Sequence, residues 1–239
     1  MIRWLTGTPY KDIMWQQPII TLFWEIINMP NQKNNWYNII PKIIQLENRQ
    51  TFPYTWTTWS ELRNQMAQDE NRIAKQIRVI QEYSTAHTCV LCELVQEVEL
   101  FYKCLTETQT ETPTTQSNQN IIIIKFHWQL KASELREQQE LFAAARERNQ
   151  PYLILGTIDM MGRWEDIPEL ETIFLFAPVK FEGTIVQAVG RWLRALPGKW
   201  EVVVYDWLDL PLLKKQAMAR LKSYKSEYTE NVLIDNIRL

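Results

Sequence analysis

One stretch of the chain combines arginine, glutamine and glycine at a spacing that suits an anionic ligand. In a helix, positions i, i+3, i+4 and i+7 lie on one face, and Gln187, Gly190, Arg191 and Arg194 have this spacing. Guanidinium groups carry a permanent charge and forked donors that match phosphate oxygens, and glycine allows close approach to the backbone. The stripe therefore indicates a polyphosphate site, with a solvated basic helix face as the alternative interpretation.

Strands and helices alternate along the part of the chain that must position this stripe. Short apolar runs predict strands, and apolar residues every three or four positions predict helices. The expected strands are 88–92, 121–126, 151–157, 172–176 and 202–206, and the expected helices are 60–84, 95–105, 133–149, 183–196 and 211–224. This alternation is typical of an α/β fold with a mainly parallel sheet, in which ligands bind at the carboxyl ends of the strands.

The beginning of the chain shows no sustained hydrophobic period, and five prolines break it into short pieces. We expect residues 1–65 to form an irregular or partly helical arm, followed by one domain over residues 66–239. The polar stretch 106–120 contains a proline and no aliphatic residue, so it predicts an exposed loop.

The arginine stripe resembles motif VI of superfamily 2 helicases, Gln-x-x-Gly-Arg-x-x-Arg, whose arginines reach ATP across the cleft between two RecA-like lobes. Residues 174–184 and 203–209 resemble the segments around this motif in the type III restriction and DEAH-like branch. Residues 152–168 resemble motif V, with Thr157 in the position that contacts nucleic acid and Asp166 in the acidic position.

Two further blocks complete the resemblance in the family's order, III, IV, V and VI. Residues 88–105 resemble motif IV and its helix, and Thr6, Gly7 and Thr8 resemble motif III, which couples the two lobes. The resemblance implies that residues 66–239 form a RecA-like helicase C-terminal domain.

The resemblance also implies roles for individual residues. Arg191 and Arg194 would act as arginine fingers on ATP, and Gln187, Gly190 and Asp166 would line the nucleotide site. No metal ligand is expected in this chain.

The chain departs from the family's pattern in two respects. It contains no Gly-x-x-x-x-Gly-Lys-Ser/Thr phosphate loop, and the magnesium-holding Asp-Glu pair belongs to the first lobe in this family. Phosphoryl transfer needs a phosphate cradle, magnesium and a positioned water together. We therefore expect no ATP hydrolysis by this chain alone, and ATP with magnesium only where a P-loop lobe is supplied in trans. Trp164 also replaces a glycine of motif V, which predicts crowding there.

Two functions from different classes follow from this pattern. The first is the second-lobe half of a superfamily 2 helicase or translocase, which supplies its arginines to ATP bound by another lobe or chain. The second is a catalytically inactive, helicase-like binding or scaffold subunit of a nucleic-acid-processing complex. Both imply a nucleic acid partner, with DNA favoured over RNA, and the first implies a protein partner that carries the first lobe.

The composition of the chain limits its partners and its cellular compartment. The net charge is −2, from 26 basic and 28 acidic residues, which excludes a basic field over the whole protein but allows a local patch. No apolar run approaches the roughly 20 residues that span a bilayer. Three cysteines are an odd number, which argues against a disulfide framework and for a reducing compartment. We expect a cytoplasmic protein without a membrane partner, and a nuclear or viral location stays open.

The cysteines and His87 have the residue types of a zinc site, but small thiols are common in protein cores. Because Cys89 and Cys92 fall on an expected strand and Cys104 on an expected helix, we favour core packing. His87 and His127 are the only histidines, and we expect structural or surface roles for both.

Tryptophan is abundant, with 11 residues. Trp56, Trp59 and Trp128 have two interpretations, stacking on the bases of a single strand or packing in a core or against a partner.

Overall fold

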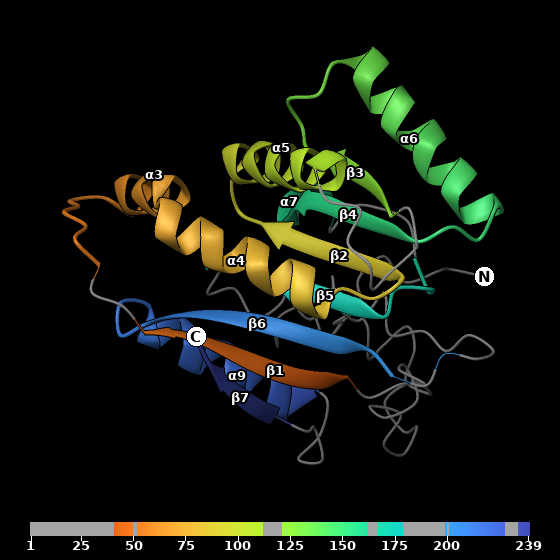
Figure 1. Cartoon of the computed structure of the whole chain (residues 1–239). Helices are drawn as coiled ribbons and strands as arrows, with labels where there is room; N and C mark the ends of the chain where they lie inside the picture. Colours follow the sequence, from red (N-terminus) through yellow and green to blue (C-terminus); the bar gives the residue numbers. More distant parts are fainter. Residues whose placement is uncertain are drawn as a thin grey trace, which may run out of the picture.

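One parallel sheet organises the part of the chain that the computed structural model describes, namely residues 41–49, 52–111, 121–161, 167–178, 199, 201–227 and 234–239. Within these residues, seven strands pair in the order β3-β4-β2-β5-β6-β1-β7 (Figure 1), and each neighbouring pair is parallel. The strands are β1 (Lys42–Arg49), β2 (His87–Cys92), β3 (Ile122–Phe126), β4 (Tyr152–Thr157), β5 (Thr172–Leu175), β6 (Val203–Leu210) and β7 (Ile234–Arg238).

Helices cover both faces of the sheet. They are α3 (Trp59–Gln68), α4 (Glu70–Tyr83), α5 (Val95–Glu111), α6 (Ala132–Glu147), α7 (Ile158–Met161) and α9 (Lys214–Glu227). On one face, Ile80 of α4 and Phe101 of α5 share an apolar cluster with the strands. On the other face, Phe142 of α6 and Tyr224 of α9 belong to a second cluster. In Figure 1, α4 and α5 accordingly lie on the side of the sheet opposite to α9.

The central strands have no polar side because both faces are covered. All six residues of β4 and all four residues of β5 are buried. Successive side chains of a strand point to opposite faces, so that Cys89 and Leu91 enter one cluster while Val90 and Cys92 enter the other. This explains why these strands read as unbroken apolar runs in the sequence.

The α/β, RecA-like fold class predicted from the sequence is confirmed, and the expected strands from β2 to β6 are found, together with the expected helices at α5, α6 and α9. The expected helix 60–84 is wrong as a single element, because Asp69 ends α3 and caps α4. Its carboxylate accepts hydrogen bonds from the backbone N–H groups of Asn71 and Arg72 at 3.0 and 3.1 Å, which provides the partners that a new helix needs. Helix α5 continues to Glu111, so the loop expected from residue 106 is wrong for residues 106–111.

The expectation of irregular or helical structure is also wrong for residues 42–49 of the arm. They form β1, which pairs with β6 along its whole length and with β7 on its other side. Its interior includes buried Gln45 and Asn48, and these polar residues interrupt the apolar pattern that marks a strand. Residues 1–40, residues 112–120 of the expected loop and the expected helix 183–196 lie outside the described residues.

No helix in the described part of the chain combines the length and the apolar character needed to cross a membrane.

Candidate nucleic-acid interface

Thr157 ends strand β4 at the carboxyl edge of the sheet. It pairs in register with Cys92, the last residue of β2, and is only 3% exposed. Within the described structure, its Oγ1 is buried without a hydrogen-bond partner. Leaving a buried hydroxyl unpaired costs about 1–3 kcal/mol, so Thr157 Oγ1 is a polar atom that the described residues leave unsatisfied.

Gly156, immediately before Thr157, leaves little room for a side chain in the present position of Met161. Helix α7 begins at the next residue, and its last residue, Met161, folds back onto the strand end. A Cβ at Gly156 would lie 2.5 Å from Met161 Cγ and 2.8 Å from Met161 Sδ. The absence of a side chain at Gly156 thus allows the tight turn that sets the position of Thr157.

His127 lies beside this strand end, on the neighbouring strand. Strand β3 pairs with β4 up to Phe126 opposite Gly156, so the next residue, His127, leaves the sheet at the level of Thr157. His127 is 4% exposed, and its Nε2 lies 2.7 Å from Glu99 Oε1 of helix α5. Its Nδ1 is buried and, in the described structure, lacks a hydrogen-bond partner. Two adjacent strand ends therefore each place an unpaired polar atom at the same edge.

Glu99 connects His127 to a lysine on the same strand. Lys125 Nζ lies 2.8 and 2.7 Å from the two carboxylate oxygens of Glu99, and 4.7 Å from the centre of the Tyr102 ring. Partial burial would raise the pKa of Glu99, but hydrogen bonds from Lys125 and His127 and the charges of these residues lower it below its ordinary value. The carboxylate is therefore ionised and holds both side chains in place.

Trp128 follows His127 and is the most exposed large apolar side chain in the described residues, at 72%. It lies on a turn in which the Leu130 N–H donates to the His127 carbonyl at 3.3 Å. Helix α6 begins four residues later, at Ala132. The indole is thus displayed on a short connection whose two ends are fixed.

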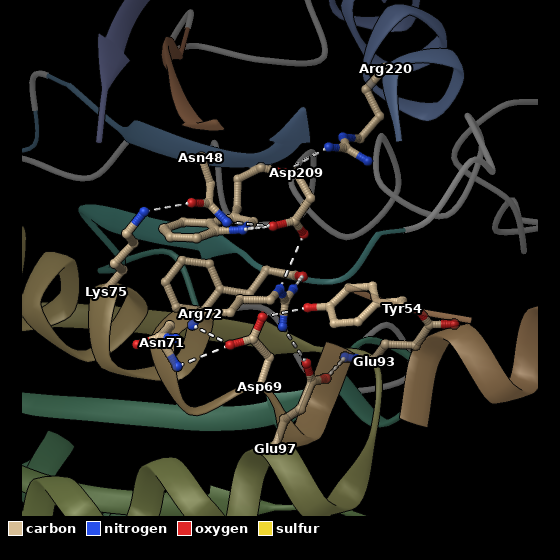
Figure 2. A network of polar contacts seen from close by, with 12 residues as sticks. Asn48, Tyr54, Asp69, Asn71, Arg72, Lys75, Glu93, Glu97, Asp209 and Arg220 are labelled. Carbon is tan, nitrogen blue, oxygen red and sulfur yellow. Dashed lines mark hydrogen bonds and ion pairs between the residues drawn. The ribbon is translucent and has the colours of Figure 1, made fainter. Parts of the chain in front are cut away.

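A buried ionic network occupies the same edge of the sheet further along (Figure 2). At its centre is Arg72 of α4, which is fully buried. Its Nη1 lies 3.0 Å from Glu97 Oε1 of α5, and its Nε lies 3.1 Å from Asp209 Oδ2 of β6. Its Nη2 donates to the carbonyl of Phe176, just after β5, at 3.2 Å. Burial by itself would lower the pKa of Arg72, but the charges of Asp209 and Glu97 raise it above its ordinary value, so the guanidinium stays charged.

The partners of Arg72 have further bonds of their own. Asp209 Oδ1 accepts hydrogen bonds from Asn48 Nδ2 at 2.9 Å and from Trp207 Nε1 at 2.8 Å. Lys75 Nζ donates to Asn48 Oδ1 at 2.9 Å. The network therefore ties the ends of β1, β5 and β6 to α4 and α5.

Of the site residues predicted from the sequence, only Thr157 is described by the structure. Arg191, Arg194, Gln187, Gly190, Asp166, Thr6, Gly7 and Thr8 lie outside the described residues, and their roles stay predictions. The connection between β5 and β6 carries the arginine stripe, and it begins at the carboxyl edge, just after Phe176.

The zinc alternative does not fit the placement of the cysteines. Cys89 and Cys92 are fully buried in clusters on opposite faces of the sheet, so they cannot bind one metal ion together. Burial raises the pKa of both thiols, which disfavours the thiolate that binds zinc. No group of three or more metal-ligating side chains is found among the residues that the structure describes.

Sequence analysis missed the cluster formed by Glu99, Lys125 and His127. The available signal was that His127 directly follows one expected strand, as Thr157 ends another. The sequence did not show that these two strands are neighbours, because strand order is decided by long-range pairing.

The fold is similar to that of several solved structures at low sequence identity. T4 UvsW matches 82% of this chain with a TM-score of 0.60 at 13% identity, and 41% of UvsW is covered. S. cerevisiae Dbp5 bound to RNA and ADP BeF3 matches 94% of this chain with a TM-score of 0.56 at 12% identity, and 48% of Dbp5 is covered. No protein-family model matches the chain, and no curated protein sequence matches it.

These similarities establish the class of fold. The chain has a RecA-like α/β fold that is similar to part of T4 UvsW and of S. cerevisiae Dbp5, and it spans less than half the length of these two structures. At such low identity, the activity and partners of the similar proteins are not transferred by the fold alone.

Proposed function

We propose that this chain is the second lobe of a superfamily 2 helicase or translocase of the type III restriction and DEAH-like branch. It binds nucleic acid at the carboxyl edge of its sheet. It supplies Arg191 and Arg194 to ATP that is bound by a P-loop in another lobe or in another chain. The observation that carries this proposal is the position of the arginine stripe in the connection between β5 and β6 of a RecA-like sheet.

The described ends of this connection support the proposal. Strands β5 and β6 are adjacent and parallel, so the chain must cross from the carboxyl edge back to the amino edge. At its start, the Phe176 carbonyl accepts from Arg72, and the Phe176 N–H donates to the Leu91 carbonyl at 2.9 Å. The segment with the arginines therefore starts from a fixed point, at the edge where ligands of parallel sheets bind.

The Thr157 and His127 strand ends support nucleic acid binding at this edge. Both have buried polar atoms without a partner in the described structure, and a threonine hydroxyl is one of the groups that bond phosphate oxygens. Dbp5, which has a similar fold, is bound to RNA and to ADP BeF3 in its structure. The sequence resemblance favours DNA over RNA as the nucleic acid that this chain binds, and binding of both should be measured.

The arginine role is tested in the assembled complex. The tagged chain is purified from its native cell, and its partners are identified by mass spectrometry. With a stoichiometric partner that carries a P-loop, Arg191→Ala or Arg194→Ala should lower the ATPase rate about 10³–10⁵-fold, as for other arginine fingers. The matched control is Arg136→Ala, which removes an exposed arginine of α6. An unchanged rate in both variants would contradict the arginine role.

The nucleic acid role is tested by binding of DNA and RNA oligonucleotides to the full chain. Thr157→Val keeps the side-chain volume and removes a hydroxyl that has no partner in the described structure, so stability should be retained. We expect weaker binding and an affinity that falls with salt, because phosphate contacts release counterions. Equal binding by the two proteins would remove Thr157 from the interface.

The second candidate function is a catalytically inactive scaffold subunit. Trp164 in the motif V segment favours it, because a bulky ring replaces a glycine there. A stoichiometric partner without a P-loop, together with retained nucleic acid binding, would establish this alternative and remove the arginines from catalysis.

A further inference from the structure

We propose that Trp128 is a stacking platform for an unpaired base of single-stranded nucleic acid. The inference rests on the proposed nucleic acid binding at the carboxyl edge and adds a contact to the bases. It starts from the exposure of the indole. Trp128 is 72% exposed, compared with 44% for Trp56 and 40% for Trp59, whereas Trp207 is only 2% exposed in the core.

The turn that carries Trp128 is preorganised. On one side, Glu99 holds the His127 ring at 2.7 Å. On the other side, the Lys131 N–H donates to Glu134 Oε2 at 2.8 Å, at the start of α6. An aromatic side chain on a fixed turn loses little backbone freedom when it binds, which favours a contact that must form repeatedly along a strand.

The surroundings of the indole suit a base better than a protein partner. Gln129 and Lys131, which follow on the same turn, are both exposed, and Lys125 is paired with Glu99 beside it. Among the described residues, Trp128 is a single exposed ring on a turn with polar and charged side chains, where the carboxylates of Glu99 and Glu134 lie close to Lys125 and Lys131. Stacking on one base with lysines near the backbone phosphates is the arrangement found in proteins that bind single strands without sequence preference.

The position of Trp128 agrees with the site already described. It follows His127, at the edge where Thr157 ends the neighbouring strand. A nucleic acid strand that runs along this edge past His127 and Thr157 would therefore pass the indole. The stacking contact would be tolerant of sequence, because every base has an aromatic face.

The test compares two oligomers of equal length and charge on the full chain. One is oligothymidylate of about 12 nucleotides, within the ~4–16 nucleotides that single binding modules cover. The other is the same backbone with abasic residues. Trp128→Ala should weaken oligothymidylate binding about 5- to 100-fold and should leave abasic binding unchanged. Trp128→Phe should restore most of the affinity, and Trp56→Ala, the exposed-tryptophan control, should change neither.

The outcomes separate the two proposals. If Trp128→Ala weakens the binding of oligothymidylate and of the abasic strand equally, or changes the binding of neither, base stacking is overturned while the proposed nucleic acid binding stands. If the unmodified chain binds neither oligothymidylate, oligouridylate nor the abasic strand, both the proposed function and the stacking role are overturned.

Discussion

Arg72 Nε and Asp209 Oδ2 lie 3.1 Å apart, although the two residues are separated by 137 positions in the sequence. Both side chains are almost completely removed from solvent. The pair joins the start of α4 to the end of β6, and the Phe176 carbonyl and Glu97 complete the coordination of the guanidinium. The carboxyl edge of the sheet is therefore held together by charge as well as by apolar packing.

Removal of the Arg72 charge should destabilise the fold strongly. Arg72→Met leaves two buried carboxylates without their cation, and breaking a buried pair in this way lowers the free energy of unfolding by about 3–5 kcal/mol. Urea denaturation followed by circular dichroism measures the change. Arg136→Ala, at an exposed position of α6, should stay within about 0.5 kcal/mol of the parent. A similar small change for Arg72→Met would show that the network contributes little.

The Glu99 cluster should contribute a pH-dependent stability. The pKa of Glu99 in the fold is below its ordinary value of 4.5, so the unfolded chain binds the proton more tightly. The contribution is therefore present above about pH 4.5 and is lost as the pH falls through the lower folded pKa.

The Glu99→Gln variant tests the direction of this pH dependence. Because the Glu99 side chain is 43% exposed, solvent screening limits its contribution to less than about 1 kcal/mol. The difference in unfolding free energy between the parent and the variant should be largest near neutral pH and should shrink in acid. A difference that grows as the pH falls would contradict the assignment.

Gly156 and Met161 should show strong coupling in a double-mutant cycle. The Cβ of Gly156→Ala would overlap with the buried Met161 side chain, and overpacking of this kind costs about 1–3 kcal/mol. Met161→Ala alone should cost about 2–5 kcal/mol through the cavity that it leaves. The double variant should be more stable than the sum of the two changes predicts, because the cavity accepts the new methyl group. Thermal unfolding measures all four corners of the cycle, and strict additivity would rule out the contact.

The three cysteines should differ in reactivity. Cys89 and Cys92 are fully buried, and burial raises the pKa of both thiols, whereas Cys104 is partly exposed. In the native protein, a thiol reagent should modify Cys104 rapidly and the other two only after unfolding. Prior addition of zinc should not change the modification rates of the three cysteines. If zinc protected all three thiols from the reagent, the metal-site interpretation would be supported.

The central strands and their helices could be predicted from the sequence. The central strands β2 and β4 and the edge strand β3 are short, mostly apolar runs, because a strand covered on both faces buries nearly all of its side chains. Helices α5 and α6 were predicted from apolar residues at helical spacing, which reflects the single face that each helix buries.

Strand β1 and the polar sites depended on the tertiary structure. In β1, Asn48 is buried because Asp209, which is 161 positions away, accepts its hydrogen bond. No local pattern contains this information, so the sequence predicted an arm there. The contact between His127 and Glu99 could not be predicted either, because it depends on the packing of α5 beside β3.

The sequence by itself thus determined the alternation of strands and helices and the residue types at the end of each strand, because apolar runs and helical periodicity are local properties. The tertiary structure alone decided which strand ends are neighbours. It also decided which charged groups could be buried, because a buried charge is stable only beside a partner that strand order and helix packing bring to it.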